Sequence, residues 1–95
     1  MEVVSWVTKF IGGPGAGRKE IEEPFVPGET VGDVLQRFSG RYPELDAALW
    51  DASKKELGEH IEVMVNDAVL GLSHTLDTPL RVNDRITLLG QYMGG

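Results

Sequence analysis

Two features of the sequence approach known chemical motifs without completing them. Gly12 and Gly17, followed by Arg18 and Lys19, nearly match a phosphate-binding loop. That loop needs Lys followed by Ser or Thr, and a helix must begin there, whereas this segment leads into residues of strand type. We therefore interpret residues 12–17 as the flexible connection of a hairpin and do not expect nucleotide binding.

The second feature is a pair of histidines. His60 and His74 lie far apart in the chain, which has no cysteine. A metal site completed by Asp or Glu is conceivable, but two surface histidines are the simpler interpretation, and we expect no metal. We find no Ser-His-Asp set, no paired-carboxylate pattern and no cofactor fingerprint. The sequence therefore predicts that the chain is not itself an enzyme.

Composition limits the partners of the chain. The 95 residues suffice for one domain, and they carry 15 Asp and Glu against 9 Lys and Arg, a formal net charge of −6. This balance argues against nucleic acid and favours a partner with a basic surface. The acidic cluster Glu20, Glu22 and Glu23 is either a solvated strand face or a docking patch for such a partner. Without a signal peptide or an apolar run long enough for a membrane span, we expect a cytoplasmic protein.

The N-terminal third predicts two strands. Residues 2–11 are rich in Val, Ile, Thr and aromatic side chains, which favours a strand, although apolar residues occur at both parities. Four glycines and a proline interrupt regular structure at residues 12–17. Residues 18–26 resume the strand pattern, and Pro24 suits an edge strand or the end of a strand. The segment therefore reads as a hairpin with a long loop.

A helix beginning at Thr30 has the clearest pattern. Thr30 and Asp33 have the spacing of a capping box, and Gly40 is typical of a helix end. The apolar residues between them share one helical face. They are Val31, Val34, Leu35 and Phe38.

The second half predicts short elements. Residues 46–51 favour a short helix, residues 61–65 a strand with alternating burial, and residues 66–67 a tight turn. A short return strand at 69–70 and a last strand at 86–89 follow. The order predicts an α+β fold, in which one main helix packs on one face of a mixed sheet and the first and last strands form its central pair.

Several of these segments carry a family resemblance. Residues 26–35 resemble the turn into the helix in the ThiS/MoaD family of small sulfur carriers. Residues 63–66, 78–80 and 83–86 resemble the family's strand, Asn turn, Pro-Leu and Asp turn before its last strand, and the chain ends in Gly94-Gly95. The resemblance implies a ubiquitin-like β-grasp fold.

The resemblance also implies a division of labour. The β-grasp domain is expected at residues 1–90 and a flexible tail at residues 91–95. A ubiquitin-activating-type partner would use ATP and Mg²⁺ to adenylate the Gly95 carboxylate, because adenylation gives a poor electrophile a good leaving group. A sulfur donor would then convert it to a thiocarboxylate, which passes sulfur to an acceptor synthase in cofactor or metabolite biosynthesis or in tRNA thiolation. The free chain is expected to be a monomer that binds no cofactor itself.

The tail and its surroundings are the expected site. Gly94, Met93 and Tyr92 would enter the active site of the partner, since glycine suits a narrow channel. Gln91-Tyr92-Met93 replaces the Pro and small residues usual in the family, which implies a dedicated partner or a different way of binding. Partner contacts are expected at Leu72, Leu89, Arg81 and Arg85. The alternatives are a ubiquitin-like modifier joined to lysines through Gly95, or a non-covalent β-grasp interaction subunit.

Overall fold

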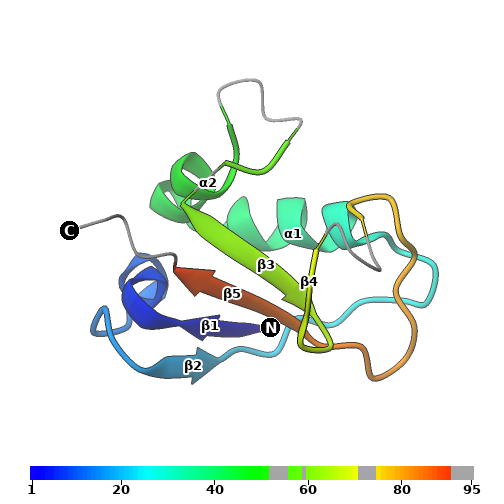
Figure 1. The fold of residues 1–95 in the computed structure, drawn as a ribbon, viewed down its shortest axis with the longest axis horizontal. Coiled ribbons are helices and arrows are strands. Elements are labelled where there is room, and N and C mark those ends of the chain that lie inside the picture. The colour runs from blue at the N-terminus through cyan, green and yellow to red at the C-terminus, as the bar shows by residue number, and fades with distance from the viewer. Residues whose placement is uncertain (52–55, 59, 71–74, 91–95) are drawn as a thin grey trace.

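The computed structural model describes residues 1–51, 56–58, 60–70 and 75–90. A five-stranded sheet of order β2-β1-β5-β3-β4 carries the helices on one face (Figure 1). β1 runs parallel to β5, and all other neighbouring strands are antiparallel. The elements are β1 (Glu2–Val4), the 3₁₀ helix η1 (Ser5–Ile11), β2 (Arg18–Glu20), α1 (Val31–Ser39), α2 (Pro43–Leu49), β3 (Ile61–Val65), β4 (Ala68–Val69) and β5 (Ile86–Gly90).

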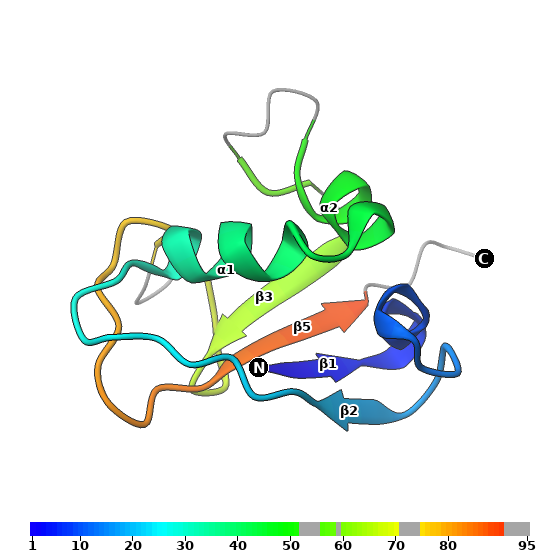
Figure 2. The ribbon, with the colours of Figure 1, turned by 180° about the vertical axis from the view of Figure 1, so that it is seen from behind.

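This arrangement agrees with the predicted α+β fold. The first and last strands lie side by side near the middle of the sheet, and α1 crosses the same face that α2 covers (Figure 2). Along β3, the odd-numbered residues from Ile61 to Val65 are buried against the helices, as their alternation predicts. No helix within the described ranges is long and apolar enough to cross a membrane.

The main helix begins and ends where the sequence predicts. The Thr30 hydroxyl accepts a hydrogen bond from the Asp33 N–H, and the Asp33 carboxylate accepts one from the Thr30 N–H, both at 3.1 Å. This reciprocal pair satisfies two backbone donors at the helix start. The predicted apolar stripe is fully buried, and Gly40 follows the last turn. A buried stripe of this kind contributes several kcal/mol at about 1.5–3 kcal/mol per side chain.

The prediction of one strand over residues 2–11 was wrong. The strand ends at Val4, Ser5 adopts a φ of 68°, and the chain continues as η1 through Ile11. The buried residues of η1 are Val7, Thr8 and Ile11, a helical spacing that places neighbouring positions toward the core, which is why no strand-like alternation is visible. The second predicted strand, residues 18–26, is confirmed only over its first three residues.

β2 is shorter than predicted and ends at Glu20. Met1 and Ile21 exchange the last backbone hydrogen bonds beside the β1–β2 pair. Pro24 cannot donate to a strand ladder. The stretch after Ile21 is instead tied to α1, where the Arg37 guanidinium binds the Glu23 carboxylate and the Pro24 carbonyl oxygen.

The acidic cluster is therefore not a uniformly solvated face. The Glu23 side chain is only 3% exposed and binds Arg37 and Arg41, whereas Glu22 is exposed. Glu20 lies 3.7 Å from the Arg85 guanidinium. Two of the three carboxylates are thus engaged within the chain.

The glycine-rich connection has a defined anchor. Thr8 is fully buried. Its side-chain hydroxyl accepts a hydrogen bond from the Gly15 N–H at 2.8 Å, and its backbone carbonyl oxygen accepts one from the Gly13 N–H. Gly12 and Gly17 have positive φ values, which glycine adopts without strain. β2 and not a helix follows the loop, so the comparison with a phosphate-binding loop fails as predicted.

Candidate functional site

The site of interest is the end of β5, where the chain passes into its last five residues. β5 pairs with β1 in parallel, with Leu89 opposite Val4. The residues that follow this pair, Ser5 and Gly90, therefore lie at the same end of the sheet. After β1 the chain continues into η1, and β5 reaches Gly90 (Figure 2).

Gly90 lies directly against the indole of Trp6. A Cβ placed on Gly90 would come within 2.6 Å of Cε2 and Nε1 of that ring, closer than real Cβ atoms approach. The glycine is thus required by the close approach of η1 to the strand end. Alternate residues of a strand face the same side, so Gly90 shares its face with Ile86 and Leu88, which are buried against the helices. The indole of Trp6 covers this face of Gly90.

The opposite face of the sheet carries a small apolar patch, Val4 and Leu89. Both side chains are partly buried, and they are direct cross-strand neighbours. Arg18 lies opposite Val4 on β2, and Glu62 lies opposite Leu89 on β3. The patch is thus bordered by one basic and one acidic residue, a common composition for the edge of a protein contact.

The predicted interface residues do not all lie together. Leu89 lies near the end of β5, but Arg85 precedes that strand and is four residues, about 13 Å at about 3.3 Å per residue, from Leu89 along it. Arg81 lies in the turn before it, where its N–H donates to the Asp84 carboxylate. Whether these arginines contact a partner stays a prediction.

The remaining predicted residues lie outside the described ranges. They are the tail residues Tyr92, Met93, Gly94 and Gly95, and the predicted contact Leu72. The boundary between a domain at 1–90 and a tail at 91–95 also stays a prediction.

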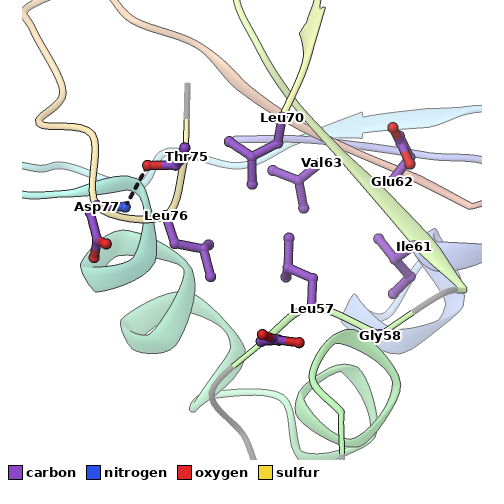
Figure 3. A pocket seen from close by; sticks show the side chains of 10 residues that line it. Leu57, Gly58, Ile61, Glu62, Val63, Leu70, Thr75, Leu76 and Asp77 are labelled. Carbon is purple, nitrogen blue, oxygen red and sulfur yellow. Dashed lines mark hydrogen bonds between the residues drawn. The ribbon is translucent and has the colours of Figure 1, made fainter. Parts of the chain in front are cut away.

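An apolar pocket of about 380 Å³ opens on the helix side of β3 (Figure 3). Leu57, Leu70 and Leu76 point toward its middle, and the backbone N–H of Asp77 donates to the Thr75 hydroxyl at its edge. Three carboxylates, one on β3 and two in connecting segments, border the apolar floor. They belong to Glu56, Glu62 and Asp77. This lining suits binding of an apolar group better than acid–base chemistry.

Electrostatics near α1 is dominated by one arginine. Hydrogen bonds from the Arg37 side chain and the Val26 N–H lower the pKa of the Glu29 carboxyl below its ordinary value of 4.5. The same carboxylate and that of Glu23 raise the pKa of Arg37. Within the described part of the chain, no three His, Cys, Asp or Glu side chains gather in a way that could hold a metal ion.

The sequence matches the model of the ThiS family over residues 14–95. The chain belongs to the ThiS family. Members of this family are small ubiquitin-like carriers or modifiers and not enzymes. The predicted family is thereby confirmed. A comparison with curated protein sequences gave no match.

Solved structures similar to this ThiS-family chain show the same fold. SAMP1 from Haloferax volcanii is 23% identical with a TM-score of 0.70, over 100% of this chain and 98% of that one. The small archaeal modifier protein 1 of Methanosarcina acetivorans is 22% identical with a TM-score of 0.72, over 99% and 94%. A chain of the Amycolatopsis orientalis BexX/CysO complex is 24% identical with a TM-score of 0.65, over 99% and 98%. The predicted ubiquitin-like β-grasp fold is confirmed.

Sequence reasoning missed Trp6 as a neighbour of Gly90 and Val4 as a neighbour of Leu89. Trp6 was assigned to a strand, and its distance in sequence from Gly90 hid their contact. The available signal was the isolated Gly90 at the end of an apolar strand, because a glycine in a strand often marks a close approach by another group.

Proposed function

We propose that this chain is a sulfur carrier whose Gly95 carboxylate is adenylated by a partner enzyme and converted to a thiocarboxylate. The observation that carries the proposal is that the family match extends through Gly94 and Gly95, while β5 already ends at Gly90. In this proposal the residues after Gly90 carry the carboxylate into the active site of the partner, while the β-grasp domain stays outside it.

The chemistry needs little from the carrier itself. The Gly95 carboxylate attacks the α-phosphorus of ATP, pyrophosphate leaves, and Mg²⁺ held by the partner balances the phosphate charge. A sulfur nucleophile then attacks the carbonyl carbon, the bond to AMP breaks, and AMP leaves with the electron pair. Glycines at the last two positions present no side chain to the walls of a narrow channel.

The patch formed by Val4 and Leu89 supports docking beside the tail. The patch lies on the sheet face opposite the helices, at the end of β5, so a partner that binds residues after Gly90 would also contact this patch. Apolar contacts of this kind supply affinity, while the acidic balance of the chain favours a basic partner surface. We include the predicted contacts Arg81 and Arg85 only as a second, separate region.

Intact mass tests the proposal directly. The chain is expressed with an adenylating enzyme of the ubiquitin-activating type and a sulfur source. Exchange of the terminal oxygen for sulfur is expected to add about 16 Da, since a covalent intermediate can be weighed. A variant lacking Gly95 must show no increase. If the full chain is never modified and the shortened variant is equally active, the proposal is wrong.

Docking is tested with matched substitutions. Val4→Ser and Leu89→Ser are expected to slow loading of the tail, whereas Val69→Ser, at an exposed position of the edge strand β4, is expected to leave it unchanged. Equal loading rates for all three variants would remove the patch from the proposal.

A second candidate is a protein modifier. It is favoured by the similarity to solved structures of small archaeal modifier proteins. Here a lysine amine instead of sulfur attacks the adenylated Gly95, giving an isopeptide bond. Lysine-linked conjugates that survive denaturation, without a thiocarboxylate, would support this candidate. Partner binding that persists without Gly95 would instead indicate a non-covalent interaction subunit.

A further inference from the structure

The contact between Trp6 and Gly90 follows from the topology. Parallel pairing of β1 and β5 brings Val4 level with Leu89, and the positive φ of Ser5 then turns the chain into η1. The first residue of that turn to carry a large side chain is Trp6. Its ring therefore lies on the last residue of β5, immediately before the tail begins.

The indole is held from several sides. Phe10 packs edge-on against it, with ring centroids 5.9 Å apart and an interplanar angle of 87°. The Lys9 ammonium lies 5.8 Å from the Trp6 ring and 5.3 Å from the Phe10 ring, within the range of a cation–π contact. Val7 and Ile11 bury the other side of η1 in the core. The ring is thus a fixed surface and not a loose side chain.

We propose that Trp6 is a positioning residue that limits the directions in which the chain leaves the sheet after Gly90. The proposal rests on the proposed function, in which the tail must enter a partner. The indole closes the helix-covered side of Gly90, so departure is restricted to the remaining directions. A restricted tail loses less conformational entropy when a partner binds it, which strengthens binding without a new contact.

The kinetic test separates positioning from chemistry. ATP–pyrophosphate exchange is measured with the adenylating enzyme at increasing carrier concentration. Trp6→Ala is expected to raise KM about tenfold with kcat nearly unchanged, since ordering one extra residue has an effect of that size. Trp6→Phe, which keeps a ring over Gly90, should recover most of the loss. Ile11→Ala is the matched control, because it weakens the core side of the same helix without touching Gly90.

A partner-free measurement keeps the proposal falsifiable. The ¹⁵N heteronuclear NOE of the Gly90 amide is expected to equal that of Leu88 in the parent chain and in Trp6→Phe. In Trp6→Ala it should fall below the Leu88 value, and in Ile11→Ala it should not. An unchanged Gly90 value in Trp6→Ala overturns the proposal whether or not adenylation occurs. A parent chain that is never adenylated, with the expected Gly90 values, refutes the proposed function alone.

If Ile11→Ala raises KM as much as Trp6→Ala does, the effect is general destabilisation and the positioning role is wrong. A fall in kcat with constant KM would also overturn it, because the proposal concerns binding of the tail and not the chemical step.

Discussion

The buried hydroxyl of Thr8 is predicted to hold the 3₁₀ helix and the glycine-rich loop in one arrangement. It donates to the Ser5 carbonyl oxygen at 3.0 Å and accepts from the Gly15 N–H at 2.8 Å. Thr8→Val preserves the shape of the side chain and removes both hydrogen bonds. The Ser5 carbonyl oxygen and the Gly15 N–H each lose this hydrogen bond, beside a side chain that is fully buried.

The expected loss can be worked from these two bonds. A net contribution of about 0.5–1.5 kcal/mol for each gives about 1–3 kcal/mol for Thr8→Val, offset in part by the added buried methyl group. Thr8→Ser keeps both bonds and removes one methyl group, so its loss is about 0.5–1.5 kcal/mol. In a domain of this size, each kcal/mol corresponds to roughly 4–8 °C in Tm.

Urea denaturation of the three proteins, with a common m-value, measures the difference in free energy of unfolding. Amide exchange adds a local test, because the Gly15 N–H should exchange faster in Thr8→Val but not in Thr8→Ser. The reasoning is refuted if Thr8→Val is as stable as the parent chain. It is equally refuted if the Gly15 N–H exchanges at the same rate in all three proteins.

Three further predictions concern other contacts. Gly90→Ala should lower stability by about 1–3 kcal/mol in urea denaturation, since its methyl group overlaps the indole, and Trp6→Ala should relieve most of that loss in the double variant. Asp67→Gly should raise stability by about 0.5–1 kcal/mol because the residue has a φ of 68°, whereas Asn66→Gly, which loses two side-chain hydrogen bonds, should lower it. A more stable Asn66→Gly would contradict this comparison. The free energy of unfolding should fall as pH drops below 4.5, because the pKa of Glu29 is lowered in the folded state, which therefore favours the carboxylate. The urea midpoint of Glu29→Gln should depend less on pH in that range than the midpoint of the parent chain.

The sequence predicted those elements whose signals are local. The helix α1 was found because a capping box, an apolar stripe and a terminal glycine all agree within a dozen residues. The turn at Asn66 and Asp67 was found for the same reason, since these residue types tolerate the positive φ that the structure has there. The family, and through it the fold, followed from the order of such signals.

The errors arose where tertiary contacts decide the local structure. Residues 5–11 have strand-type composition, yet their buried face is that of a helix because η1 must close the end of the sheet beside β5. Glu23 carries no local sign of burial, and it is the helix α1 and the turn after it that bring Arg37 and Arg41 to its carboxylate. Propensity is a weak guide at both places, because the surroundings override it.

The candidate site shows the same limit most clearly. Terminal glycines, read with the family resemblance, point to where chemistry would occur, but they say nothing of what guides the tail there. That guidance depends on which residues flank the end of the last strand. In a sheet whose first and last strands are parallel neighbours, those residues come from the very start of the chain. The contact between Trp6 and Gly90 can therefore be recognised only once the parallel pairing of β1 and β5 is known. The indole leaves no room for a Cβ at position 90, which explains why that residue is glycine.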